Sequence, residues 1–275
     1  MKKILVPVDF SKEAKYACKV AATIAKKTKS EIILLHMLDI PSKIIDPLNS
    51  NGMRGGAQSI AYMKAIHRKF EKYKALPFFK GIKLTEDVKF HKAFEGVIQE
   101  SKKHKVDLII MGSQGATGLK EMIVGSNTEK VVRSSDIPVL VIKHDVENFA
   151  IKNILFASDF SAKSKKNFKK VINFAKLFNA KINLLFVNTI HNFETSRESQ
   201  KKLNAFVKNL DFKHSINICN DKTVEEGILN YGRENNSDII AINTHGRSGL
   251  SQLFNESISK ELANHALRPV ITFKI

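Results

Sequence analysis

The sequence has few of the features that mark secreted, membrane-spanning or metal-clustered proteins. Its two cysteines, Cys18 and Cys219, lie too far apart for a zinc-binding motif, and we interpret them as small core residues in a reducing compartment. No apolar run approaches the ~20 residues that a membrane helix requires. The acid Asp9 follows the first apolar run too early for a signal peptide. We therefore expect a cytoplasmic protein without a membrane partner.

Common catalytic motifs are missing as well. The sequence contains no Gly-x4-Gly-Lys-Ser/Thr phosphate loop, no HExxH metal motif, no Gly-x-Ser-x-Gly turn and no Ser-Gly-Gly-x-Asp motif. Hydrolysis of a nucleotide needs a positioned water and a cation beside the transferred phosphate. Because no side chain can be assigned to that water, we assign no catalytic residue and no metal ligand, and enzymatic activity stays open.

Negative charge is scarce relative to positive charge. The 275 residues include 45 Lys and Arg against 27 Asp and Glu, a formal net charge of +18. This balance favours anionic partners such as nucleotides, nucleic acid or a membrane surface. The lysines are scattered, however, and no arginine-rich tract or aromatic-basic interleaving occurs. The pattern indicates a solvated basic surface rather than a nucleic-acid interface.

The chain contains one internal repeat. Residues 2–11, KKILVPVDFS, reappear as KNILFASDFS at 152–161, and residues 31–37 reappear at 181–187. Farther along, 107–110 matches 238–241 and 137–142 matches 268–273. The first copy is longer, with a segment near 41–58 that is rich in Gly, Pro, Asn and Ser. Two copies predict two domains of one fold, which we place at 1–146 and 147–275.

Strands and helices alternate in each copy. The predicted strands are 3–8, 31–38, 82–90, 106–111 and 137–142, then 152–157, 181–188, 212–218, 238–243 and 269–274. The predicted helices include 12–28, 57–75, 162–178 and 195–210, with others starting near Ala93 and Thr223 and after each fourth strand. This alternation predicts an α/β fold of two doubly wound, five-stranded parallel sheets with strand order 3-2-1-4-5. The ligand crevice then lies at the carboxyl ends of strands one and four.

A glycine-rich loop follows the fourth strand of the first copy and leads into a predicted helix. Its spacing is Gly112-x2-Gly115-x9-Gly125-Ser126. Glycine lets the backbone approach a ligand closely, and free N–H groups at a helix start attract anions. We expect the three glycines to wrap phosphates, and Ser126 and Asn127 to donate hydrogen bonds to the terminal ones. The alternative is a loop whose glycines serve only for turning.

This spacing resembles the phosphate-binding motif of the universal stress protein family, in its ATP-binding branch. The resemblance covers nearly the whole chain as a tandem pair and implies an adenine-nucleotide-hydrolase-like fold that binds ATP, with Mg²⁺ or Mn²⁺. It also implies roles for several residues. Asp9 hydrogen-bonds the nucleoside, Met37 contacts adenine, Met111 flanks the base or ribose, and the backbone of Pro7 and Val8 lies beside Asp9. The alternatives are a plain helix cap for Asp9 and core packing for Met37, and we interpret His36 as a core histidine.

The second copy departs from the motif. Asn243 stands in place of Gly112 and Glu256 in place of Gly125, while Gly246 and Ser257 persist. A carboxylate ~4 Å from a phosphate costs about 1 kcal/mol even in water, and more in a cleft. We expect this copy to have lost triphosphate binding and to serve packing, dimerisation or another ligand. His245 and Arg247 either bind a smaller anion or lie on a solvent-facing loop.

These observations favour an ATP-binding regulatory protein whose nucleotide state changes its partners or its dimer surface. The alternatives are a slow ATPase of the same superfamily and a structural hub that binds no nucleotide. The resemblance implies pairing through the last strands, 137–142 against 269–273, as an intrachain pseudo-dimer, or a homodimer. Residues 41–58 form either a lid over the nucleotide or a surface excursion. The identity of any regulatory protein partner is not encoded in a readable motif.

Overall fold

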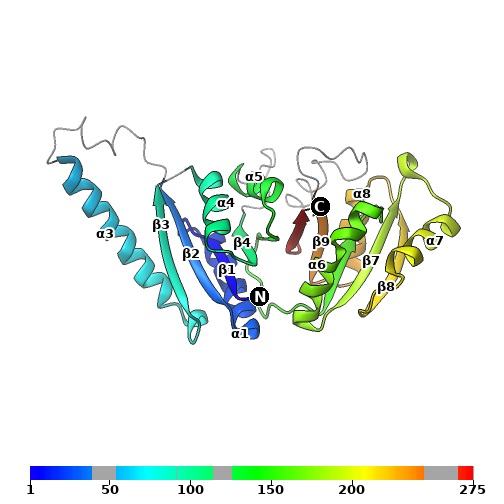
Figure 1. The fold of residues 1–275 in the computed structure, drawn as a ribbon, viewed down its shortest axis with the longest axis horizontal. Helices are drawn as coiled ribbons and strands as arrows, with labels where there is room; N and C mark the ends of the chain where they lie inside the picture. Colours follow the sequence, from blue (N-terminus) through cyan, green and yellow to red (C-terminus); the bar gives the residue numbers. More distant parts are fainter. Residues whose placement is uncertain (39–53, 91, 114–125, 245–265, 275) are drawn as a thin grey trace. The chain divides into compact units, whose positions relative to one another are not determined.

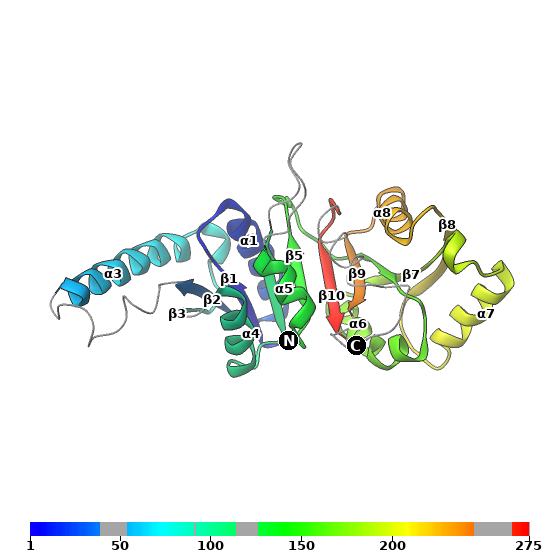
Figure 2. The same cartoon turned by 90° about the horizontal axis from the view of Figure 1, so that it is seen from above.

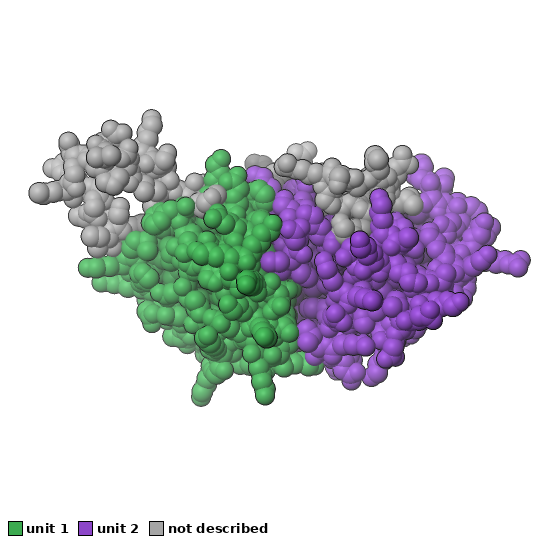
Figure 3. Space-filling view, viewed as in Figure 1, with its two compact units in different colours: residues 1–110 green, residues 111–275 purple. Residues whose placement is uncertain are grey.

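The computed structural model describes residues 1–38, 54–90, 92–113, 126–244 and 266–274. These residues fall into two compact units, Met1–Ile110 and Met111–Ile275, which Figure 3 colours separately. The last helix predicted for the second copy lies outside the described residues. No helix in the described segments is long and apolar enough to cross a membrane.

The first unit is a parallel sheet flanked by helices (Figure 1). Its elements are β1 (Lys3–Pro7), α1 (Lys12–Thr28), β2 (Glu31–Leu38), α3 (Arg54–Lys74), η1 (Pro77–Phe79), β3 (Leu84–Phe90), α4 (Ala93–Lys103) and the first part of β4 (Leu108–Gly112). The strand order is β3-β2-β1-β4, with every pair parallel. Because α1 and α4 cover opposite faces (Figure 2), the central residues of β1 and β2 are almost fully buried, as in other parallel sheets.

The second unit holds the rest of the chain. Its elements are α5 (Ser126–Ser134), β5 (Val139–Ile142), β6 (Asn153–Ala157), α6 (Ala162–Phe178), β7 (Lys181–Asn188), η2 (Ile190–Asn192), α7 (Ser196–Val207), β8 (His214–Asn220), α8 (Val224–Glu234), β9 (Ile239–Thr244) and β10 (Val270–Lys274). Strands β8-β7-β6-β9-β10 are neighbours in this order and all parallel. This is the predicted order 3-2-1-4-5, complete within the second copy.

The last strands of the two copies pair with each other, as predicted. Within the second unit, β10 runs antiparallel to β5, with Leu140 opposite Ile271 and Val139 opposite Thr272. Leu140 and Ile271 are fully buried. The strand order of the first copy continues from β4 to β5. The N–H of Ser113, directly after β4, donates to the carbonyl of Ile142 at the end of β5 (2.9 Å). Apolar burial between β5 and β10 therefore joins the carboxyl-terminal strands of both copies.

The core of the second unit has two layers, one on each face of its sheet. Leu155, Ile240 and Ile242 pack towards Ile228 of α8. Alternate residues point the other way, so Phe156 contacts Phe168 of α6 with ring centroids 4.8 Å apart. Figure 2 shows α6 and α8 on opposite sides of these strands. Both faces are thus covered, which explains why β9 carries an unbroken run of buried residues.

Several predicted boundaries differ from the structure by two or three residues, and two of them have a clear physical cause. The fifth strand begins at Val139 rather than at residue 137, because Pro138 has no N–H to donate to a neighbouring strand. The hydroxyl of Ser135 also accepts the N–H of Ile137 and donates to its carbonyl, so both backbone groups of Ile137 are used locally. Helix α3 begins at Arg54, so Gly55 and Gly56 are helical although their composition predicted a loop. Each glycine costs about 1 kcal/mol relative to alanine in a helix. Burial of Phe70, farther along α3, outweighs this cost.

Candidate functional site

The turn after β1 places the first group of predicted site residues. Pro7 ends β1 and is half-buried, Val8 is buried, and Asp9 is exposed. The N–H of Val8 donates to the carbonyl of Leu35 in β2 (2.8 Å), which extends the pairing of β1 with β2 by one residue. A carboxylate oxygen of Asp9 accepts the N–H of Ser11 (2.9 Å), and the Ser11 hydroxyl caps α1. Asp9 therefore both braces the helix start and presents its carboxylate to solvent.

The end of β2 lies beside this turn. Nδ1 of His36 donates to the carbonyl of Val8 (2.6 Å), so His36 is a satisfied, half-buried histidine, as the sequence predicted. Met37, the next residue, is half-buried in β2 opposite Lys89 of β3. The structure thus brings Pro7, Val8, Asp9 and Met37 to the carboxyl ends of two neighbouring strands.

Helix α3 supplies an aromatic support for this turn that the sequence analysis missed. Phe10 adopts a left-handed backbone conformation (φ 66°), and its ring packs against His36 (4.9 Å between centroids), Phe70 (5.2 Å) and Tyr73 (5.5 Å). Burial raises the pKa of the Tyr73 phenol, with smaller contributions from Cys18 and Asp9. A positive φ is unusual for phenylalanine, so these contacts hold the turn in a conformation that local preference disfavours.

The second group of predicted residues follows β4. Met111 is buried, and Gly112 ends the strand. The hydroxyl of Thr128, in the first turn of α5, donates to the carbonyl of Gly112 (3.3 Å). This hydrogen bond places the start of α5 directly at the tip of β4. The first N–H groups of α5, which have no partner within the helix itself, therefore lie at the carboxyl end of β4, an arrangement that binds anions in other α/β proteins.

Four predicted residues remain to be placed. Ser126 is the first residue of α5, and Asn127 follows it with an exposed side chain. Gly115 and Gly125 lie outside the described residues. Ser113 is the last described residue before this loop. Its hydroxyl is buried and makes no hydrogen bond within the described part of the chain. A buried, unpaired hydroxyl is costly unless water or a ligand satisfies it.

The equivalent turn in the second copy differs in chemistry. Asp159 corresponds to Asp9 but is buried. Its Oδ1 accepts the hydroxyl of Ser164 (2.6 Å), the N–H of Ser161 (3.1 Å) and the hydroxyl of Ser158 (3.3 Å). Burial raises the pKa of Asp159, but these hydrogen bonds together outweigh burial and hold the pKa below its usual value. Asp159 is therefore an internal structural carboxylate, enclosed by three serines.

The tip of β9, equivalent to that of β4, is also altered. Asn243 occupies the position of Gly112 and is buried beside Phe273 of β10. Neither its amide nitrogen nor its amide oxygen makes a hydrogen bond within the described segments, and the hydroxyl of Thr244 is likewise buried and unpaired. The side chain of Asn243 fills the space that a glycine would leave open for a ligand's approach to the backbone.

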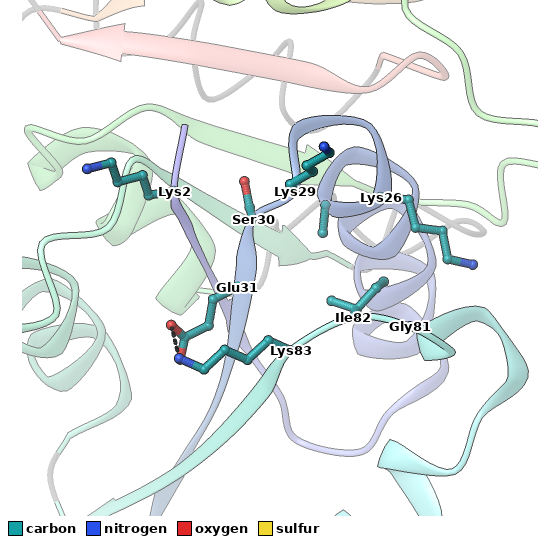
Figure 4. A pocket seen from close by; sticks show the side chains of 9 residues that line it. Lys2, Lys26, Lys29, Ser30, Glu31, Gly81, Ile82 and Lys83 are labelled. Carbon is teal, nitrogen blue, oxygen red and sulfur yellow. Dashed lines mark hydrogen bonds and ion pairs between the residues drawn. The ribbon is translucent and has the colours of Figure 1, made fainter.

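A basic pocket lies elsewhere in the first unit, at the amino ends of its strands (Figure 4). It has an open volume of about 500 Å³ and is lined by Lys2, Lys26, Lys29 and Lys83, among others. Lys83 is paired with Glu31 (3.1 Å). Figure 4 shows the side chains of Lys2, Lys26 and Lys29 extending in different directions. Because these amino groups do not converge on one point, the pocket does not form an anion site comparable to the glycine loop.

Comparison with known proteins identifies the fold family. The family model described as the universal stress protein family matches residues 1–143 and again residues 150–274. The chain belongs to the universal stress protein family. It is a tandem member, because the two matches cover both copies of the repeat. The first match ends before residue 146 and the second begins after it. The division at residue 146 itself stays a prediction.

Several universal stress proteins are similar to this chain. Universal stress protein Slr1230 of Synechocystis is 26% identical over 290 residues, which cover 100% of both chains. Universal stress protein MJ0577 of Methanocaldococcus jannaschii is 34% identical over 154 residues, which cover 52% of this chain and 94% of that protein. The crystal structure of a universal stress protein from Archaeoglobus fulgidus matches with a TM-score of 0.75 at 20% identity, covering 99% of this chain and 98% of that one. That structural match supports the fold alone.

The sequence signal for the missed residues of this universal stress protein was present but unused. Thr128 is a hydroxyl residue two positions after Ser126, where a side chain can reach back to the strand tip. Ser158 and Ser164 stand where the first copy has Val8 and Ala14. A comparison of the two copies at every position around Asp9, rather than within the glycine motif alone, would have revealed the enclosed carboxylate.

Proposed function

We propose that this protein is a nucleotide-dependent regulator whose first copy binds ATP, with Mg²⁺ or Mn²⁺, and whose second copy does not. Asp9 and Met37, with the backbone at Pro7 and Val8, hold the nucleoside, and Met111 flanks it. The phosphates lie on the glycine loop, through Gly112, Gly115, Gly125, Ser126 and Asn127. The domain boundary after residue 146 is part of this proposal, and so is a regulatory rather than a catalytic role.

The difference between two equivalent aspartates carries the proposal. Asp9 is exposed and uses one carboxylate oxygen for Ser11, whereas Asp159 is buried and its Oδ1 accepts three hydrogen bonds from three serine residues. A carboxylate recognises ribose or base hydroxyl and amino groups only when an oxygen can accept a further hydrogen bond. The exposed carboxylate of Asp9 meets this requirement, whereas Asp159 is 8% exposed and one of its oxygens already accepts three hydrogen bonds. The two copies therefore offer opposite chemistry at the same point of one fold.

The start of α5 supports the phosphate half of the proposal. The Thr128–Gly112 hydrogen bond (3.3 Å) holds the helix start at the tip of β4, and N–H groups at a helix start attract anions. In the second copy the buried side chain of Asn243 replaces the glycine at that tip. Glu256, which lies outside the described residues, adds a negative charge to the corresponding loop. Both substitutions oppose a triphosphate.

A matched pair of glycine variants tests this function. Calorimetry of the full chain with Mg²⁺ and ATP should give one site per chain. Gly115→Val should weaken binding about tenfold or more, because a branched side chain covers the backbone N–H groups, and tenfold is about 1.4 kcal/mol. Gly246→Val, at the equivalent position of the second copy, should leave the affinity unchanged.

Two results would contradict the proposal. One is a second ATP site of similar affinity in the wild-type chain, which would show that the second copy also binds. The other is equal affinity of the wild type and Gly115→Val. Circular dichroism of each variant provides the folding control, so that a lost site is distinguished from a lost fold.

A further inference from the structure

A cluster of potential metal ligands lies in the first unit, outside the residues assigned to the nucleotide. Asp87 is on β3, Glu100 is on α4, and His104 is the C-cap residue of α4. Each offers one ligand atom, and the three atoms lie within 4.8 Å of one another. Glu100 and His104 are four residues apart on α4 and its carboxyl-terminal cap, so their side chains share one face. The strand supplies the third ligand atom from Asp87.

Glu100 has a buried carboxylate oxygen without a hydrogen-bond partner among the described residues. The residue is only 5% exposed, and its Oε2 atom is buried without a hydrogen bond in the described part of the chain. Nε2 of His104 lies 3.5 Å and Nζ of Lys103 lies 3.6 Å from this oxygen. Charge-assisted hydrogen bonds are shorter, about 2.7–2.9 Å. A buried carboxylate oxygen without such a bond is strongly disfavoured, and this oxygen faces His104, inside the cluster.

We propose that Asp87, Glu100 and His104 bind a divalent transition-metal ion such as Zn²⁺ or Mn²⁺. One imidazole nitrogen and two carboxylate oxygens suit these ions better than Ca²⁺ or Mg²⁺, which prefer oxygen ligands alone. An ion bonded at about 2.0–2.2 Å to each ligand satisfies Glu100 without a change of fold. The site is separate from the ion that accompanies ATP, since none of the three residues belongs to the proposed nucleotide site.

Ion pairing offers a competing explanation for the cluster. Nε2 of His104 lies 2.8 Å from Oδ2 of Asp87, and Nζ of Lys89 lies 2.8 Å from its Oδ1. His104 and Lys89 thus each contact one oxygen of Asp87. They leave Oε2 of Glu100 unbonded, which an ion shared among all three residues does not. A bound ion must displace the proton on Nε2 and compete with the Lys89 ammonium for Asp87.

Titration of the full-length, chelator-treated protein with Zn²⁺ or Mn²⁺ alone, without nucleotide, tests the site. Calorimetry should show one high-affinity site, and His104→Gln and Glu100→Gln should each weaken it at least tenfold. Lys89→Gln should strengthen binding, because it removes a competing cation. A purely structural ion-pair network predicts no such gain. The bound ion should also raise the melting temperature of the wild type but not of His104→Gln.

His67→Gln is the matched control. His67 lies in α3, and its Nδ1 contacts Oε1 of Glu86 on β3 at 2.8 Å, a histidine–carboxylate contact that resembles that of His104 with Asp87. This variant removes one imidazole but should leave the affinity for the ion unchanged. The proposal is overturned if the wild type binds neither ion, or if binding survives His104→Gln and Glu100→Gln. It is equally overturned if His67→Gln weakens binding as much as His104→Gln does. Should His104→Gln fail to fold, Glu100→Gln and Lys89→Gln decide the question.

Discussion

At the scale of single residues, the two copies of this protein differ most around one carboxylate. Val8 and Ala14 offer Asp9 no side-chain donor, and its exposed carboxylate accepts the N–H of Ser11. Ser158 and Ser164 at the equivalent positions donate to Asp159 and hold it inside. Two small substitutions thus accompany the change from an exposed aspartate to a buried one at the same point of the fold.

Transfer of the two hydroxyls tests this explanation. The double variant Val8→Ser with Ala14→Ser should enclose Asp9 as Asp159 is enclosed, and the variant should bind ATP about tenfold or more weakly in calorimetry. The corresponding double variant in the second copy, Ser158→Val with Ser164→Ala, should leave ATP binding by the first copy unaltered. Unchanged affinity in the first double variant, with its fold intact, would show that an enclosed Asp9 is compatible with binding.

At the scale of elements, close approach of a helix to the sheet depends on glycine at one position. A Cβ atom at Gly227 of α8 would lie 2.5 Å from Cγ1 of Val187 in β7 and 3.2 Å from Cβ of Asp221. Gly232, one and a half turns later, is less crowded, with its nearest neighbour Cδ2 of Leu155 at 3.3 Å. The two glycines therefore have different physical roles in one helix.

These glycines predict opposite effects on stability. Gly227→Ala should lower the free energy of unfolding by about 1–3 kcal/mol, because α8 must move away from β7. Gly232→Ala should be neutral or raise it by up to about 1 kcal/mol, since alanine has the higher helix propensity. Urea denaturation followed by circular dichroism measures both. Equal destabilisation by the two variants would contradict the crowding argument.

At the scale of the whole molecule, the end of the first copy is tied to the second copy by a buried lysine as well as by β5 and β10. Lys143 follows β5, is 7% exposed, and donates from Nζ to the carbonyl of Ala266 (2.9 Å), just before β10. Burial lowers the pKa of Lys143 from 10.5 to about 7. The amine is therefore easier to protonate in the unfolded chain than in the folded one.

This difference predicts a dependence of stability on pH. Between about pH 7 and 10.5 the unfolded chain binds the proton and the folded chain does not, so the free energy of unfolding should rise as pH increases across this window. Below it both states are charged and the destabilisation is constant. Chemical denaturation at several pH values, with Lys143→Met as the reference, isolates this contribution. An equal slope in wild type and variant would assign the pH dependence to other groups.

The fold was largely predictable from the sequence because its signals are local and repeated. Alternating buried runs and capped helices predicted β1, α1, β2 and α6 within a residue or two, and the family resemblance implied the pairing of β5 with β10. Glycine content misled at Gly55 and Gly56, where burial of Phe70 along the same helix prevails over local propensity. The helix α5 after the glycine motif was likewise predicted, while anion binding by that motif stays a prediction.

By itself, the sequence determined the element order, the two copies, the family and the glycine motif, because hydrophobic period and residue spacing act over short stretches of chain. Only the tertiary structure decided that Asp9 is exposed while Asp159 is enclosed, since that depends on which side chains surround each carboxylate. The tertiary structure alone also brought Asp87 to Glu100 and His104, because strand and helix are separate elements whose side chains meet only when they pack. Long-range packing, which no local pattern encodes, therefore determined both the surroundings of the two aspartates and the assembly of the Asp87 cluster.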